Sequence, residues 1–235
     1  MDRFVAPRPR FRDRHDAGRQ LGERLAAVAD EAPVVLGLTR GGVPVACEVA
    51  RALGAPLDFL VVRKLGVPWH RELAFGALGE DGARYLNSTL VARLGLTPDA
   101  ITDVASREAD ELARRVARYR RVRPEIDVAG RTVVVVDDGL ATGASAKVAC
   151  EVARARGARR VLVAVPVAAR EAREELASYA DEVVSLLVPT DFSAVGEFYE
   201  DFAQTDDQEV VDLLVEEAHR DDDGDGDGDG DGDRG

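Results

Sequence analysis

Residues 133–145 carry the pattern that most restricts how this chain can fold. Four consecutive valines, Val133–Val136, are typical of a strand that is buried on both faces. Two acids, Asp137 and Asp138, follow directly, and small or hydroxyl-bearing residues then lead into a helical stretch. This order of strand, short loop and helix predicts a parallel α/β unit. In such units, ligands bind just beyond the carboxyl end of the strand.

The loop after the two acids suits a phosphate group, although an ordinary strand–helix turn capped by aspartate is the alternative. Small residues let backbone N–H groups approach phosphate oxygens closely, and the next helix adds its N-terminal dipole. The two carboxylates can accept hydrogen bonds from a neighbouring sugar diol. The loop matches neither the G-x4-G-K-[ST] nor the G-x-G-x-x-G phosphate motif. The residues expected to hold the phosphate are Gly139, Ala141, Thr142, Gly143, Ala144 and Ser145.

The segment VVVVDDGLATGAS resembles the fingerprint of the type I phosphoribosyltransferases, which has four hydrophobic residues, two acids and a small-residue loop with Thr-Gly. VRKLG, ELAFGAL and the late VGEFYEDFAQ are similar to stand-alone bacterial and archaeal proteins with this domain. The resemblance implies that Asp137 and Asp138 bind the ribose hydroxyls of phosphoribosyl pyrophosphate and act in catalysis. It also implies that Gly139 and Ala141–Ser145 bind the 5-phosphate. The family further implies a homodimer and Mg²⁺ that is held through the substrate, with no direct protein ligand.

Two other segments are expected to handle the pyrophosphate. The first resembles the pyrophosphate loop of the family but would by itself be an ordinary turn; it comprises Thr39, Arg40, Gly41 and Gly42. The second, Arg63–Ala83, corresponds to the mobile catalytic loop and is expected to contain a long loop and a strand pair around Gly79–Gly82. Arg63 and Lys64 are the expected catalytic cations of this loop, and His70 and Arg71 could also reach the pyrophosphate.

Strand and helix patterns alternate along the rest of the chain, which predicts a doubly wound, mainly parallel sheet with helices on both faces. Strands are expected at Pro33–Leu38, Leu57–Val62, Arg131–Val136, Val161–Val165 and Glu182–Val188. Helices are expected at Asp16–Ala29, Val43–Leu53, from Thr97 to about Arg121, and at Ala144–Arg156, Ala168–Tyr179 and Asp207–His219. One domain, residues 1–220, is therefore expected, with a small hood from about 1–14 and 189–205.

The hood is expected to place the acceptor over the ribose. Its aromatic residues could stack on a base, or they could simply pack against the core; they are Phe192, Phe198, Tyr199 and Phe202. The Asp/Gly repeat of residues 221–235 has no apolar residue and is expected to be disordered.

Charge and composition exclude several kinds of protein. The net charge is −13, of which the last fifteen residues supply −7, so no basic footprint for nucleic acid is present. No apolar run approaches the length of a membrane span, and the N-terminus has no signal-peptide core, so a cytoplasmic protein is expected. Cys47 and Cys150 are expected to be buried, small hydrophobic residues.

These observations predict an enzyme of nucleotide metabolism. It would transfer ribose 5-phosphate from phosphoribosyl pyrophosphate to a nitrogen nucleophile, a nucleobase for instance, with release of pyrophosphate. Two alternatives stay open at this stage. One is a non-catalytic sensor of nucleotides or phosphoribosyl pyrophosphate with the same fold, and the other is a hydrolase of the sugar-phosphate donor.

Overall fold

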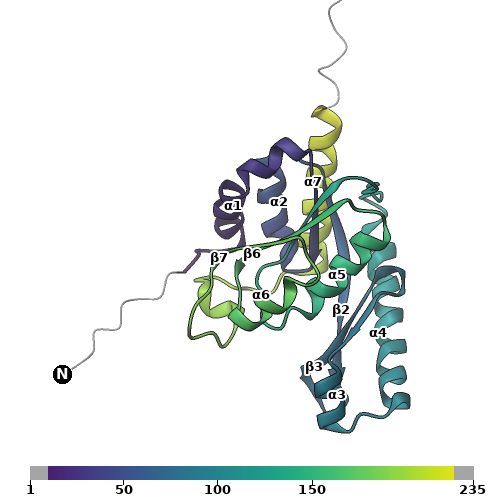
Figure 1. Cartoon of the computed structure of the whole chain (residues 1–235). Helices are drawn as coiled ribbons and strands as arrows, with labels where there is room; N and C mark the ends of the chain where they lie inside the picture. Colours follow the sequence, from purple (N-terminus) through teal and green to yellow (C-terminus); the bar gives the residue numbers. More distant parts are fainter. Residues whose placement is uncertain (1–9, 225–235) are drawn as a thin grey trace, which may run out of the picture.

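The chain forms a seven-stranded sheet in the order β4-β3-β2-β1-β5-β6-β7 (Figure 1). The structure, a computed structural model, describes residues 10–224, apart from the side chains of residues 71, 72 and 222–224. Five strands are parallel: β1 (Val34–Thr39), β2 (Leu57–Val67), β5 (Thr132–Val136), β6 (Arg160–Val167) and β7 (Glu182–Leu187). Two strands at one end of the sheet are antiparallel: β3 (His70–Gly79) and the edge strand β4 (Arg84–Leu86). The predicted mainly parallel sheet is thus confirmed.

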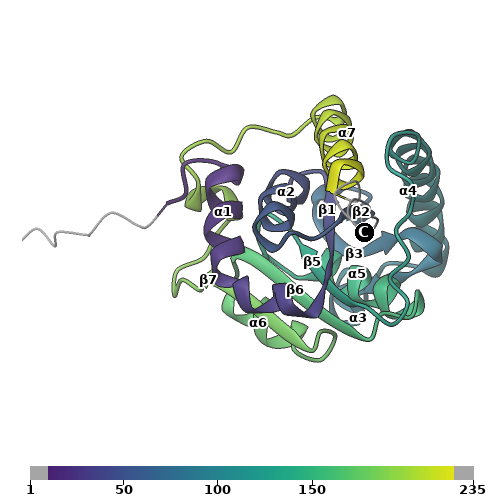
Figure 2. The same cartoon turned by 90° about the horizontal axis from the view of Figure 1, so that it is seen from above.

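Helices cover both faces of the sheet (Figure 2), which confirms the doubly wound arrangement. One face carries α1 (Arg14–Arg24), α2 (Gly42–Leu53), α3 (Ser88–Leu94), α4 (Pro98–Tyr119) and α7 (Asp207–Gly224). The other face carries α5 (Ala144–Ala155) and α6 (Arg170–Leu176). Short 3-10 turns occur at Ala26–Glu31, Glu80–Gly82 and Val195–Phe198.

Strand β5 lies between β1 and β6 in the sheet, and its valines pack into the core on both faces. Val134 and Val136 pack on the α2 side, and Val133 and Val135 pack on the α5 side, all of them fully buried. Successive side chains of a strand point to opposite faces, so an all-valine strand needs a helix layer on each side. This packing fixes the position of the carboxyl end of β5, and Asp137 is the first residue after that end.

The segment 63–83, expected to contain a long loop as well as a strand pair, is mostly strand. The β2–β3 hairpin continues past the sheet to a turn at Pro68 and Trp69, and the expected strand pair around Gly79–Gly82 is formed by β3 and β4. The hairpin is ordered because Leu65 and Phe75 are buried in the same cluster as residues of α4. Sequence reasoning missed this because the covering helix lies more than twenty residues away in the chain.

Several predicted helix boundaries are also wrong: the helix expected at Ala168–Tyr179 is shorter, Arg170–Leu176, and two others differ more. The helix expected at Asp16–Ala29 ends at Arg24 and continues as the 3-10 turn Ala26–Glu31. At the other end, α7 extends to Gly224, so the first four residues of the expected tail are helical. Tertiary contacts hold this end, because Asp221 accepts a hydrogen bond from Arg123 and Arg220 bonds the carbonyl oxygen of Ala55 at 2.9 Å. Residues 225–235, the rest of the expected tail, lie outside the described residues.

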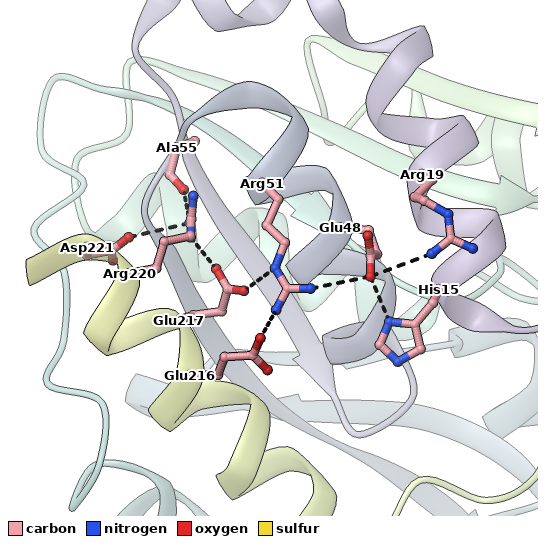
Figure 3. Close-up of polar contacts among 9 residues, drawn as sticks. All are labelled: His15, Arg19, Glu48, Arg51, Ala55, Glu216, Glu217, Arg220 and Asp221. Atoms are coloured by element: carbon pink, nitrogen blue, oxygen red, sulfur yellow. Dashed lines mark hydrogen bonds and ion pairs between the residues drawn. The ribbon is translucent and has the colours of Figure 1, made fainter. Parts of the chain in front are cut away.

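A network of ion pairs joins α1, α2 and α7 (Figure 3). Arg51 of α2 contacts Glu217 at 2.7 Å and Glu216 at 2.8 Å, both on α7. Glu217 is fully buried and also pairs with Arg220 at 2.7 Å. On the far side of Arg51, Glu48 bonds His15 of α1 at 2.9 Å. These contacts fix the first and last helices to the one that follows β1.

The described part of the chain contains no helix that is both long and apolar enough to span a membrane. Cys47 and Cys150 are free thiols and are buried, as the sequence predicted. Burial raises the pKa of the Cys150 thiol to about 12 and that of the Cys47 thiol further still. Both therefore behave as small core residues.

Candidate functional site

A cleft of about 1190 Å³ opens at the carboxyl edge of the parallel strands. Its walls come from the ends of β1 and β5, the middle of β2, helix α4 and the segment 193–205. This is where ligands are expected in an open α/β sheet. The predicted donor-site residues that line it are Thr39, Arg40, Gly41, Arg63, Lys64, Asp137, Asp138, Gly139, Ala141, Thr142, Gly143, Ala144 and Ser145.

The turn after β1 lies directly against the two acids after β5. A Cβ atom at Gly41 would be 2.2 Å from Oδ2 of Asp138, and one at Gly42 would be 2.9 Å from the Cα of Asp137. Only glycine fits at these two positions, because real Cβ contacts are essentially never that short. Thr39 precedes them through a cis peptide to Arg40, and its buried hydroxyl has no hydrogen-bond partner among the described residues. The two predicted loops therefore form one continuous surface.

Asp137 and Asp138 are a coupled acidic pair. Burial, together with the neighbouring charge of Asp138, raises the pKa of Asp137 to about 8. Burial also raises the pKa of Asp138, against the opposing effect of the Arg14 and Lys64 charges. The N–H of Asp138 donates to Oδ1 of Asp137 at 2.9 Å, which favours the charged form of Asp137. Near neutral pH the pair consequently holds a proton that it can release.

The loop that follows Asp138 ends at the start of α5. Gly143 has a φ of 73°, a conformation that favours glycine, and it directly precedes the first helical residue, Ala144. The first N–H groups of a helix have no partner within the helix, and at α5 that of Ala144 makes only a long contact, 3.5 Å, to the hydroxyl of Thr142. Such a helix start can offer its N–H groups to an anion. Thr142 is exposed and Ser145 half-buried, and both line the cleft. The geometry suits the predicted phosphate contact, and the contact itself stays a prediction.

The three predicted cations differ in how they are held. Arg63 forms a two-point ion pair with Glu108 of α4, at 2.8 and 2.7 Å. Arg40 lies 3.8 Å from Asp207 at the start of α7. Lys64 is exposed, yet its charge lowers the pKa of both site aspartates, so it acts on the acidic pair across the cleft. Of the two more distant candidates, His70 is exposed and absent from the lining, and the side chain of Arg71 lies outside the described part.

Sequence reasoning missed three arginines that line the cleft. Arg14 contacts Asp138, and Arg107 and Arg115 come from α4. Arg107 and Arg115 are eight residues apart, which places them on the same side of a helix. That spacing is visible in the sequence, but it does not show that this side of α4 faces the cleft. For Arg14 no local signal exists, because its partner is 124 residues away.

The expectation that Phe192, Phe198 and Tyr199 contact the acceptor is not supported by their positions. Phe198 and Tyr199 are buried, at 1% and 3% exposure, and Phe192 stacks on Phe198 with ring centroids 5.8 Å apart. None of the three lines the cleft. Their apolar surface is used to build the core of the hood itself, which was the alternative interpretation. Phe202 does line the cleft, with the guanidinium of Arg14 over its ring.

The fold and the cleft together define a class of protein: an α/β protein with a ligand cleft at the carboxyl edge of its parallel strands, where two acids lie between two glycine-containing loops. A comparison with protein families identifies which family of this class the chain matches. Residues 80–203 match the model of the phosphoribosyl transferase domain. This match covers more than half of the chain, which therefore belongs to the phosphoribosyltransferase family.

Individual proteins support this assignment. Two Mycobacterium tuberculosis proteins, from strains CDC 1551 and H37Rv, are named as candidate phosphoribosyl transferases and are each 56% identical to this chain over 211 residues. Those residues are 90% of this chain but 47% of each relative, so the chain spans about half the length of these curated relatives. The crystal structure of the protein TT1426 from Thermus thermophilus is similar, with 51% identity and a TM-score of 0.74. The matched region makes up 88% of this chain and 98% of the Thermus thermophilus chain.

Proposed function

We propose that this chain binds phosphoribosyl pyrophosphate and transfers its ribose 5-phosphate to a nitrogen nucleophile. One observation carries the proposal: the turn Thr39–Gly42 lies directly against Asp137 and Asp138. The loop proposed to bind the pyrophosphate therefore adjoins the acids proposed to bind the ribose, and this supports a donor that carries pyrophosphate on C1 of its ribose. The family match supports the same donor.

In the proposed complex each part of the donor has its own set of groups. The ribose hydroxyls donate to the carboxylates of Asp137 and Asp138. The 5-phosphate accepts hydrogen bonds from backbone N–H groups of residues 141–145 and from the hydroxyls of Thr142 and Ser145. The pyrophosphate lies on Thr39–Gly42, where the free hydroxyl of Thr39 can donate to it.

Arg40, Arg63 and Lys64 supply positive charge for the leaving group. As the bond between C1 and the pyrophosphate oxygen breaks, its electrons move to the pyrophosphate, and the new bond forms from the nucleophile's nitrogen lone pair to C1. The nitrogen then loses its proton to the released pyrophosphate or to water, which leaves the product neutral at that atom. Cations placed where this charge develops lower the barrier. Arg63 would first have to leave Glu108, which holds it now. Closure of the hairpin that carries Arg63 and Lys64 would also exclude water from the reacting carbon.

Mg²⁺ is part of the proposal, as an ion carried mainly by the substrate. The site offers carboxylate oxygens, which Mg²⁺ prefers, and the described residues contain no group of three or more His, Cys, Asp or Glu that could cage a metal. A Mg²⁺ ion that keeps its waters and the pyrophosphate oxygens would fit beside Asp137 and Asp138. When bound, it would neutralise charge on the pyrophosphate.

The test is to incubate the protein with phosphoribosyl pyrophosphate, Mg²⁺ and a panel of nucleobases, and to measure pyrophosphate release. Release that depends on one base supports the transferase. Release without any acceptor indicates a donor hydrolase, and tight binding without turnover indicates a sensor. The Asp138→Asn variant is the control, with its melting temperature checked. If this variant binds the donor as tightly as the wild type does, the assignment of the ribose site is wrong.

A further inference from the structure

The two parts of the hood are joined by main-chain hydrogen bonds. The N–H of Phe11 donates to the carbonyl of Phe198, and the N–H of Glu200 donates back to the carbonyl of Phe11, both at 2.8 Å. A third bond, from the N–H of Asp201 to the carbonyl of Arg12, continues the pairing. Because of this pairing, residues 11–12 and 198–201 are held together as one unit beside the cleft.

Arg14, at the start of α1, connects this unit to the acidic pair. Its Nε and one terminal nitrogen both bond Oδ2 of Asp138, at 2.9 and 2.8 Å. Its other terminal nitrogen donates to the carbonyl of Ala203 at 2.7 Å, and the guanidinium lies 4.0 Å from the ring centroid of Phe202. The side chain is only 11% exposed, and all three of its nitrogens are bonded, so the group is held firmly.

The hood also holds the main chain of Asp138. The hydroxyl of Tyr199 donates to the carbonyl oxygen of Asp138 at 2.6 Å. Both bonds from Arg14 go to Oδ2 of Asp138, and this leaves Oδ1 on the other side of the carboxylate for a ligand hydroxyl. Asp138 is therefore fixed at its side chain and its backbone by residues that are distant in the sequence.

The charged groups around Asp138 act in opposite directions. Burial and the neighbouring Asp137 disfavour a second negative charge at this place, while Arg14 from α1 and Lys64 from β2 favour it. Tyr199, the remaining titratable neighbour, stays neutral because burial raises its pKa above the usual value. Of the two cations, Lys64 is exposed and screened by solvent, whereas Arg14 makes direct bonds. Arg14 is thus the main compensating charge.

We propose that Arg14 is a positioning residue of the ribose site, which keeps Asp138 ionised and oriented to accept a ribose hydroxyl. This inference rests on the proposed function, since it assigns the ribose to Asp138. Arg14 itself need not touch the donor. Because it also holds Ala203 and Phe202, it links the donor site to the second part of the hood.

Three variants test this inference: Arg14→Gln removes the charge, Arg14→Lys keeps the charge but loses the two-point geometry, and Arg12→Gln is the matched control. Arg12 lies on the same segment, but its side chain is 69% exposed and, within the described part of the chain, pairs with Asp16 of α1. Its main-chain bond to Asp201 is unaffected by the substitution. Melting temperatures establish that each variant is folded.

The first measurement needs no ligand: carboxyl-carbon NMR follows the titration of the Asp137–Asp138 pair. We expect the titration to move up by at least about one pH unit in Arg14→Gln, and not to move in Arg12→Gln. The second measurement is the Kd for phosphoribosyl pyrophosphate with Mg²⁺ from pH 6.5 to 9. We expect Arg14→Gln to weaken binding at pH 7 at least about tenfold and to recover part of this at pH 9, with Arg14→Lys in between.

An unchanged NMR titration in Arg14→Gln overturns the inference, whatever happens to binding. A loss of affinity that is the same at every pH also overturns it, because it would show that Arg14 only supports the hood. If the wild type itself fails to bind the donor, the proposed function fails. The NMR result then still decides whether Arg14 controls the charge of Asp138.

Discussion

Gly41 and Asp138 approach so closely that any side chain at position 41 would displace the carboxylate. A Cβ there would lie 2.2 Å from Oδ2 of Asp138 and 3.3 Å from Nε of Arg14. We expect Gly41→Ala to weaken donor binding by at least about tenfold, because one methyl group has to push the acid from its place. Isothermal titration measures the affinity and thermal unfolding checks the fold. An alanine variant with wild-type affinity would show that the ribose does not depend on this position of Asp138.

The pH dependence of donor binding follows from the raised pKa of Asp137. With a pKa of about 8, Asp137 is mostly protonated at pH 7, and it has to ionise to accept a hydroxyl hydrogen bond as a carboxylate. We therefore expect affinity to rise as the pH increases from 6.5 to 8.5, with up to about one proton released per donor bound at pH 7. Calorimetry in two buffers of different ionisation enthalpy measures the proton release. A flat pH profile without proton release would contradict this assignment.

Stability should depend on pH in the opposite direction. The folded-state pKa of Asp137 lies above the unfolded value, so the stability it contributes is fully present below about pH 4 and is lost as the pH rises through about 8. We expect Asp137→Asn to be more stable than the wild type at pH 9, by on the order of 1–2 kcal/mol, and equally stable near pH 4. Urea unfolding at both pH values measures this, with the exposed Asp30→Asn as control. A constant difference between wild type and Asp137→Asn would argue against a buried charge at position 137.

Trp69 is the only tryptophan in the chain and is 67% exposed at the tip of the β2–β3 hairpin. Its neighbours Gly66 and Pro68 line the cleft. If the hairpin closes over the bound donor, the indole becomes less accessible to water. We expect saturating donor and Mg²⁺ to reduce acrylamide quenching of the fluorescence about twofold or more. Unchanged quenching at saturation, with binding confirmed independently, would show that the hairpin stays open.

The α1–α2–α7 network offers a stability test away from the cleft. Glu217 is fully buried and pairs with Arg51 and Arg220. Among residues 10–224, the neighbouring Glu216 pairs with Arg51 alone and is 65% exposed (Figure 3). We expect Glu217→Gln to lower the free energy of unfolding by about 1–3 kcal/mol, because two arginines lose a desolvated partner. Glu216→Gln should cost less than about 1 kcal/mol. Equal effects in urea unfolding would mean that burial does not strengthen these pairs.

Local sequence patterns determined the parts of this protein that depend on neighbouring residues. Four valines followed by two acids and a small-residue loop predicted the central strand, its carboxyl end and the start of α5, and all three are present. The alternation of strands and helices predicted the doubly wound sheet. These features follow from side-chain periodicity and backbone freedom, which a short stretch of chain already contains.

Only the tertiary structure decided which distant residues meet at the site. The hairpin after β2 is ordered because α4 covers it, and the aromatic residues of the hood are buried because they pack on one another. Arg14 reaches Asp138 across 124 residues, a contact that no local pattern encodes. The sequence thus determined the carboxylates and the loops of the predicted donor site. The charge that controls those carboxylates was set by chain segments brought together only when the molecule folds, because electrostatic effects depend on distance in space and on burial.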